Sequence, residues 1–257
     1  MYKGRWTPML AEERKLKIME YVAEYGSVRV SDLAEEFVVS TETVRRYLDE
    51  LEKDQKLKKV YGGAVRLSEK EEPPILNRET KNRLEKRLIA EQAVSFILEG
   101  DVVFIDEGTT TLQMADGLSR FKEITVMTTS FPLANRLMQT DFEGDIIFLG
   151  GLVQKDHWRT AGSLTTKVVR ELHADKAFIA VDGVHPEFGL SCYDSDKAVL
   201  GQMYMEQVET SYALADYSKM NMRATHCIAP LQQVDFIVTD RPAEGSWSND
   251  NWVVAQP

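Results

Sequence analysis

Between residues 101 and 240 the chain alternates short apolar runs with stretches whose apolar residues recur at helical spacing. The apolar runs, each a predicted strand, are 101–106, 123–128, 145–151, 175–183, 210–216 and 234–240. The predicted helices between them are 110–120, 131–139, 163–173 and 195–208. Apolar strands separated by amphipathic helices form a mainly parallel sheet, because helices on both faces then bury both surfaces of the strands. The sequence therefore predicts an α/β domain.

A longer helix is predicted just before the first of these strands, over about residues 79–98. Its apolar residues recur at the three- and four-residue steps of a buried helix face. The residues expected to point inward are Leu84, Leu88, Ile89, Ala93 and Ile97.

Small and polar residues follow five of the predicted strands where each strand ends. Because ligands of parallel sheets bind at the carboxyl ends of the strands, we expect these residues to form one binding site. They are Asp106, Gly108, Thr109, Thr110, Thr111, Thr128, Thr129, Ser130, Gly150, Gly151, Asp182, Gly183, Asp216, Ser218 and Lys219.

The chemistry of this set favours a small phosphorylated, polyhydroxylated ligand. A loop of glycine and threonine at 108–111 can donate backbone and hydroxyl hydrogen bonds to an anion. Asp106 and Asp182 can accept hydrogen bonds from sugar hydroxyls, and Lys219 can pair with a phosphate or a carboxylate. Arg159 is expected in a loop that closes over the ligand and reaches its phosphate. Neither GxGxxG nor GxxxxGK[ST] is present, which disfavours dinucleotide and P-loop sites.

The first 66 residues have a different pattern, with three predicted helices in quick succession. The first spans about 12–26, with Leu16, Met19, Val22 and Ala23 on its apolar face. A second short helix is predicted over 32–37 with Ser31 as its N-cap, and a third over 41–54 with Ser40 as its N-cap.

The start of the third helix has the residue types that bind DNA. Ser40, Thr41 and Thr43 can contact phosphate, while Arg45 and Arg46 can contact phosphate or guanine in the major groove. A basic and apolar stretch then surrounds a glycine pair at 62–63, which predicts a hairpin "wing" with its tip at Gly62. The side chains of Lys58 and Lys59 add candidate phosphate contacts.

The charge distribution also separates the two regions. Residues 1–66 contain 13 Lys and Arg against 12 Asp and Glu, a net charge of +1, whereas the whole chain is at −10. The domains expected are therefore a winged helix-turn-helix over 1–66, a charged and proline-containing linker over 67–78, and the α/β domain over 79–257.

The N-terminal region resembles the winged helix-turn-helix of DeoR-type bacterial transcription regulators. In that family a Ser-x-x-Thr motif leads into an aliphatic residue and Arg-Arg-Asp-Leu, and the wing ends in Gly-Gly-Ala. The matching residues are Ser40, Thr43, Val44, Arg45, Arg46, Leu48, Gly62, Gly63 and Ala64. The chain departs at Tyr47 and Tyr61, where the family usually has Asp and His.

The rest of the chain resembles the sensor domain of the same family, which is similar to ribose-phosphate isomerases. The matching residues are Asp106, Gly108 to Thr111, Thr128, Ser130, Gly150, Gly151, Gly162, Asp175, Ala177, Phe178, Ala215, Asp216, Ser218 and Lys219. One stretch departs, since Lys197 and Gly201 stand where the family usually has Glu and Lys. The resemblance implies a repressor of a carbohydrate-use operon that binds double-stranded operator DNA as a dimer or tetramer and responds to a phosphorylated sugar.

Two alternatives remain open at this stage, a sugar-phosphate isomerase and a DNA-binding protein with a vestigial pocket. Isomerisation needs a placed base, and Lys197 occupies the usual Glu position, so we expect no enzyme activity and name no catalytic residue. The two cysteines and four histidines show no metal-ligand spacing, so neither a metal nor another cofactor is expected. No apolar run approaches a membrane span and the N-terminus lacks a signal-peptide core, which favours a soluble cytoplasmic protein.

Overall fold

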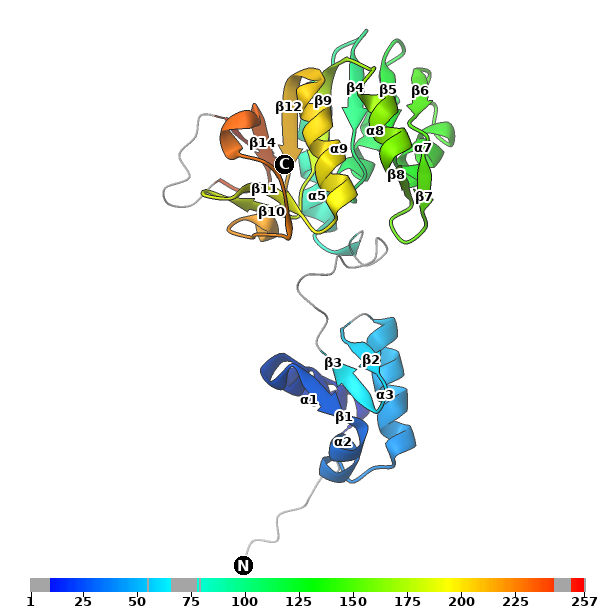
Figure 1. The fold of residues 1–257 in the computed structure, drawn as a ribbon, viewed down its shortest axis with the longest axis vertical. Coiled ribbons are helices and arrows are strands. Elements are labelled where there is room, and N and C mark those ends of the chain that lie inside the picture. The colour runs from blue at the N-terminus through cyan, green and yellow to red at the C-terminus, as the bar shows by residue number, and fades with distance from the viewer. Residues whose placement is uncertain (1–9, 55, 66–77, 79, 243–250, 257) are drawn as a thin grey trace, which may run out of the picture. The chain divides into compact units, whose positions relative to one another are not determined.

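The computed structural model describes residues 10–54, 56–65, 78, 80–242 and 251–256 (Figure 1). The chain divides into two compact units, Met1–Pro73 and Pro74–Pro257. Of the linker predicted over 67–78, only residue 78 lies among the described residues. None of the helices in the described part of the chain combines the length and the apolar character that crossing a bilayer requires.

The larger unit is built on a parallel sheet whose described strands lie in the order β15-β14-β12-β9-β4-β5-β6. The strands are β4 (Val102–Ile105), β5 (Thr125–Thr128), β6 (Asp145–Phe148), β9 (Ala174–Ala180), β12 (Val208–Leu214), β14 (Phe236–Thr239) and β15 (Trp252–Val254). All but β15 overlap the predicted apolar runs, with β9 and β12 starting one and two residues earlier, so the α/β prediction is confirmed.

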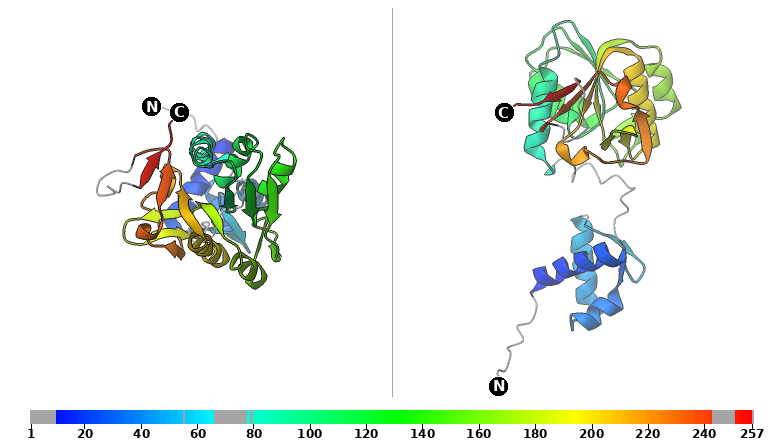
Figure 2. Two further views of the ribbon diagram at one scale, coloured as in Figure 1. Left: turned by 90° about the horizontal axis from the view of Figure 1, so that it is seen from above. Right: turned by 90° about the vertical axis from the view of Figure 1, so that its left-hand side faces the viewer.

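Helices cover both faces of this sheet, and Figure 2 shows α5 and α9 on opposite sides of it. One face packs against α5 (Arg83–Val94), α6 (Ala115–Leu118) and α7 (Phe131–Met138), and the other against α8 (Ser163–Val169) and α9 (Ser195–Glu206). Successive residues of a strand point to opposite faces. In β4, Val103 and Ile105 therefore join the first core while Phe104 joins the second.

Several short strands lie outside the predicted pattern. The hairpin β7 (Leu152–Gln154) and β8 (Arg159–Ala161) follows β6, and β10 (Gly183–His185), β11 (Gly189–Cys192) and β13 (His226–Ala229) form a small antiparallel sheet. Each has three or four residues. These strands mix polar with apolar residues, as in Leu-Val-Gln of β7 and Arg-Thr-Ala of β8, so they lack the continuous apolar run that marks β4.

The helix predicted over 79–98 is shorter in the structure. Asn82 adopts a left-handed backbone (φ 53°), so α5 begins only at Arg83, and it ends at Val94. Ile89 is fully buried as predicted, but Leu84 is 76% exposed and its assignment to the core was wrong. The apolar face of α5 therefore starts later than the sequence pattern indicated.

The smaller unit is a winged helix-turn-helix, as predicted. Its elements are α1 (Ala11–Tyr25), β1 (Ser27–Arg29), α2 (Val30–Glu36), α3 (Thr41–Lys53), β2 (Lys58–Val60) and β3 (Gly63–Val65). β2 and β3 form the wing hairpin, and β1 pairs with the other edge of β3. Gly62 at the wing tip has φ 81°, a left-handed conformation that favours glycine.

Two local predictions for this unit need correction. Ser31 does not cap α2, because the helix begins at Val30, two residues before the predicted start, with Arg29 at the cap position. Leu16 is 61% exposed, and Ile18 occupies the core of α1 instead, together with the predicted Val22. The predicted cap at Ser40 is confirmed, since its hydroxyl accepts a hydrogen bond from the Thr43 N–H.

Truncating Ile89 and Leu84 tests the corrected face of α5. We expect Ile89→Ala to lower the free energy of unfolding by about 2–5 kcal/mol, because it leaves a cavity between helix and sheet. Leu84→Ala, one turn earlier and exposed, should change it by less than about 0.5 kcal/mol. Denaturant unfolding of both variants measures the difference, and equal losses would place Leu84 in the core after all.

Candidate functional site

The structure brings the predicted strand-end residues to one edge of the sheet. The strands β12, β9, β4, β5 and β6 are consecutive neighbours and all parallel, so their carboxyl ends lie together. Most of the polar residues there are buried, including Asp106, Thr111, Thr128, Thr129 and Asp182. A buried cluster of polar residues at this edge is where a parallel sheet binds its ligand.

The loop after β4 packs tightly against the neighbouring strand. A Cβ on Gly108 would lie 2.4 Å from the Cβ of Ala180 at the end of β9, so only glycine fits there. The Thr111 hydroxyl donates to the Gly108 carbonyl at 3.1 Å. No hydrogen bond between described residues uses the backbone N–H groups of Gly108, Thr109 or Thr110. Successive unused N–H groups of this kind bind anions such as phosphate.

Arg159 lies in strand β8, and the expectation of an open loop at this position was wrong. Its guanidinium is fully buried, with Nη1 2.6 Å from Glu107 Oε1 and Nε 2.7 Å from Gln154 Oε1. A further ion pair joins it to Asp194, at the N-cap of α9. Arg159 therefore joins three elements around the site, and each of its three nitrogens donates to one of these partners.

Two lysines lie against the Asp182 carboxylate. The Nζ of Lys197, from α9, is 3.7 Å from Asp182 Oδ2 and 3.8 Å from Glu107 Oε1. The Nζ of Lys219, which is 26% exposed, is 3.8 Å from Asp182 Oδ1. These separations are ion pairs rather than hydrogen bonds. Lys197 is 1% exposed, so the charge that departs from the family pattern lies inside the site.

Asp106 is the most isolated acceptor in the cluster. Its side chain is 1% exposed, and neither carboxylate oxygen has a hydrogen-bond partner among the described residues. Burial raises the pKa of this carboxyl well above its ordinary value, although the positive charge of Lys197 opposes the shift. Burial and the nearby Asp106 charge likewise raise the pKa of the Tyr204 hydroxyl.

Other predicted site residues have structural partners. The Thr128 hydroxyl accepts from the Ser130 N–H, and the Ser130 hydroxyl caps α7 by accepting from the Leu133 N–H. The Gly150 carbonyl accepts from Thr165, while Gly151 and Gly183 lie where a Cβ would clash with neighbouring atoms. These residues shape the edge of the site, whereas Asp106 and Asp182 present unpartnered atoms to it.

Asp216 connects the site to the start of α5. Its Oδ1 accepts from Asn82 Nδ2 at 2.8 Å and from the Ser218 N–H at 3.0 Å. Lys219 follows in the same short turn, η2 (Tyr217–Lys219), and pairs with Asp182. Asn82 is therefore linked to the candidate site through Asp216 and Lys219.

Sequence reasoning missed several members of the cluster. Asp194 is the N-cap of α9 and Tyr204 lies within that helix. Neither follows a predicted strand, so their positions in the sequence did not mark them as site residues. Glu107 follows Asp106 in sequence but was not among the predicted site residues, yet it is 1% exposed and pairs with Arg159. Among the described residues, no group of three His, Cys, Asp or Glu could hold a metal ion.

In the smaller unit, the predicted DNA-binding residues lie around the start of α3 and the wing. Thr41, Arg45 and Arg46 are exposed, and Thr43 is half-buried beneath the Ser40 cap. Arg45 pairs loosely with Glu42 at 3.4 Å. The residues at the wing are Lys58, which is exposed, Lys59, which is half-buried, and Gly62, which is at the tip.

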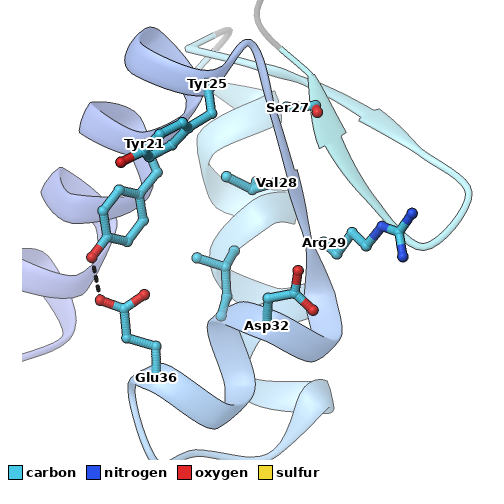
Figure 3. A pocket seen from close by; sticks show the side chains of 8 residues that line it. Tyr21, Tyr25, Ser27, Val28, Arg29, Asp32 and Glu36 are labelled. Atoms are coloured by element: carbon cyan, nitrogen blue, oxygen red, sulfur yellow. Dashed lines mark hydrogen bonds between the residues drawn. The ribbon is translucent and has the colours of Figure 1, made fainter.

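The cations of this surface differ in their partners. The Lys59 ammonium is held by Asp49. Arg29, which sequence reasoning missed, is exposed and pairs with Gly63 across β1 and β3, beside the wing. The only signal for it was a single arginine before the second helix. Arg29 also lines the pocket formed with Tyr21, Tyr25 and Glu36, and Figure 3 shows its side chain pointing away from those three residues.

Comparison with known families assigns both units. Residues 14–70 match the DeoR-like helix-turn-helix domain, and residues 81–241 match the DeoR C terminal sensor domain. Among solved structures, ribose 5-phosphate isomerase A of Methanocaldococcus jannaschii aligns with a TM-score of 0.40 at 19% identity, over 55% of each chain. At that TM-score the likeness supports no conclusion about activity.

Relatives match over nearly the whole chain. Two uncharacterized HTH-type transcriptional regulators of Bacillus subtilis (strain 168) are similar: FruR is 34% identical over 90% of this chain and 92% of its own, and YulB is 35% identical over 90% of each. The putative aga operon transcriptional repressor of Escherichia coli O157:H7 is 31% identical over 89% of this chain and 86% of its own. The chain therefore belongs to the DeoR family and is a transcriptional regulator in which a helix-turn-helix domain precedes a sensor domain.

Proposed function

We propose that the chain represses a carbohydrate-use operon in the cytoplasm and that a phosphorylated sugar, bound at the strand ends, changes its affinity for operator DNA. The observation that supports this most is that two kinds of unused group lie at the same sheet edge. Buried carboxylates on Asp106 and Asp182 have unpartnered oxygens, and the N–H groups at 108–110 have no acceptor among the described residues. Carboxylates accept hydrogen bonds from sugar hydroxyls, and the N–H groups donate to phosphate.

A homo-oligomer, either a dimer or a tetramer, is part of the proposal. A helix-turn-helix usually binds as a pair, so that two recognition helices contact half-sites one helical turn apart. Each protomer would contribute α3 and its wing, and operator affinity would depend on how two such units are spaced. A relative named as an operon repressor supports the direction of control.

The alternative of an isomerase has less support. A general base must lie free to take a proton from the sugar, yet Glu107 and Asp194 are both ion-paired with Arg159. Asp182 is ion-paired with Lys197 and Lys219, which leaves Asp106 as the carboxyl of this cluster without an ion pair among the described residues. We therefore propose binding without turnover.

Binding of the intact protein to the DNA upstream of its own gene tests the function. With a panel of sugar phosphates at fixed salt, we expect one compound to shift DNA affinity at least tenfold, about 1.4 kcal/mol of coupling. Fluorescence anisotropy of labelled DNA measures it. Tight DNA binding that ignores every compound would refute the effector, and conversion of a sugar phosphate would favour the isomerase.

The DNA surface is tested by the salt dependence of binding. Each lost phosphate contact should reduce the slope of log affinity against log salt by about 0.9. We expect this for Arg46→Ala and Arg29→Ala, and a smaller change for Lys59→Ala because Asp49 holds that ammonium. Lys167→Ala, an exposed cation of the sensor unit, is the control. An unchanged slope in Arg29→Ala would remove Arg29 from the contact surface.

Asn82 offers a route from the ligand to the linker, because its amide holds Asp216 beside Lys219. A phosphate of the ligand, or a ligand hydroxyl that faces a carboxylate, can draw Lys219 inward. This would move η2, and with it the hydrogen bond between Asp216 and Asn82. The residues that precede Asn82 lead to the helix-turn-helix. A shift at Asn82 therefore changes the point at which the chain enters the sensor unit from the linker.

We expect Asn82→Gly to reduce the coupling between sugar and DNA to less than threefold while leaving affinity for DNA alone within about twofold. The reason is that the variant removes the side chain that holds Asp216, while glycine keeps the left-handed backbone at this position. Titration of DNA with and without the active compound measures the coupling. Asn135→Ala, an exposed asparagine on α7, should keep full coupling. Full coupling in Asn82→Gly would exclude this route.

A further inference from the structure

Several buried polar atoms at the strand ends have no hydrogen-bond partner among the described residues. They include carboxylate oxygens of Asp106, Glu107 and Asp182. All three side chains are at least nine-tenths buried. Buried polar atoms are nearly always hydrogen-bonded, so three such carboxyl groups in one region point to a missing ligand.

The cations of the cluster do not fill these positions. Arg159 donates to Gln154, to the other oxygen of Glu107 and to Asp194. Lys197 and Lys219 lie 3.7–3.8 Å from Asp182, which neutralises charge without forming a hydrogen bond. The vacant positions are therefore oxygens of carboxyl groups, and they call for a ligand that brings donors.

The charge of the cluster restricts which ligands can supply these hydrogen-bond donors. Four carboxylates (Asp106, Glu107, Asp182 and Asp194) face three cations (Arg159, Lys197 and Lys219). Burial already opposes ionisation of Asp106. A further carboxylate on the ligand would be buried among these groups without a cation of its own, and such an uncompensated charge is strongly unfavourable.

Resting on the proposed function, we propose that the effector ends in a neutral polyhydroxyl group, as in an alditol, aldose or ketose phosphate, and that sugar-acid phosphates are selected against. The hydroxyls donate to Asp106, Glu107 and Asp182, and the phosphate at the other end binds the N–H groups of 108–110. The site thus selects by the charge at the end of the sugar opposite the phosphate.

Matched pairs of compounds test this directly. Each pair has the same length and phosphate but differs at the far carbon, CH₂OH or COO⁻: erythritol 4-phosphate and 4-phosphoerythronate, ribitol 5-phosphate and 5-phosphoribonate, glucitol 6-phosphate and 6-phosphogluconate. Isothermal titration of the full chain measures each affinity. We expect the alditol phosphate to bind at least tenfold more tightly than the acid in the best-binding pair.

The outcomes distinguish failure of the charge selectivity from failure of the proposed effector. An acid that binds as tightly as its alditol overturns the selectivity and leaves a phosphorylated effector standing. Failure of every member of the three pairs overturns the neutral polyol end. If the wider sugar-phosphate panel also leaves DNA binding unchanged, the effector part of the proposed function fails with it.

Variants assign the selectivity to the carboxylates. Asp182→Asn removes one negative charge at similar size, so the ratio of acid to alditol dissociation constants should fall at least threefold. Glu171→Gln, an exposed carboxylate after α8, should keep the wild-type ratio. An unchanged ratio in Asp182→Asn would remove that carboxylate from the selectivity. The wild-type pairs decide the main proposal even if Asp182→Asn fails to fold.

Discussion

The buried guanidinium of Arg159 is the interaction on which the arrangement of the sensor site depends. It links the loop after β4 through Glu107, the β7–β8 hairpin through Gln154 and the N-cap of α9 through Asp194. Burial alone would lower the pKa of the guanidinium, but the two carboxylates outweigh this and raise it. Removing one partner from a buried pair typically costs about 3–5 kcal/mol, because the other charge is left uncompensated. Three elements are thus held together by a group that cannot lose its charge.

The same interaction shows where prediction from sequence succeeds and fails. The strands and their polar ends were predictable, because parallel topology alone brings Asp106 and Asp182 to one edge. The position of Arg159 was not, because β8 has three residues and its partners are 35 and 52 residues away. Local patterns report which residues are apolar, whereas the partner of a buried charge is set by tertiary contacts.

Errors in helix phase have a related cause. Leu16 and Leu84 fit an apolar stripe, yet both are exposed, while Ile18 and Ile89 are fully buried. In α5 the left-handed backbone of Asn82 delays the helix start. The side chain of Asn82 donates a hydrogen bond to Asp216, which follows β12 much later in the chain. A hydrogen bond between residues 134 positions apart leaves no local signal.

The structure also explains why Lys197 and Gly201 in α9 differ from the residues usual in the family. Lys197 lies between Glu107 and Asp182, so an acidic residue there would add a carboxylate to a cluster that already has an excess of them. A Cβ on Gly201, one turn later, would lie 3.1 Å from Ile228 and 3.5 Å from Ile179, so a side chain there would first meet the apolar core. Lys197 is therefore the cation that α9 supplies to the cluster. Because ligand and operator affinities are linked reciprocally, any change in how Lys197 balances these carboxylates would alter the response of DNA binding as well as the choice of sugar.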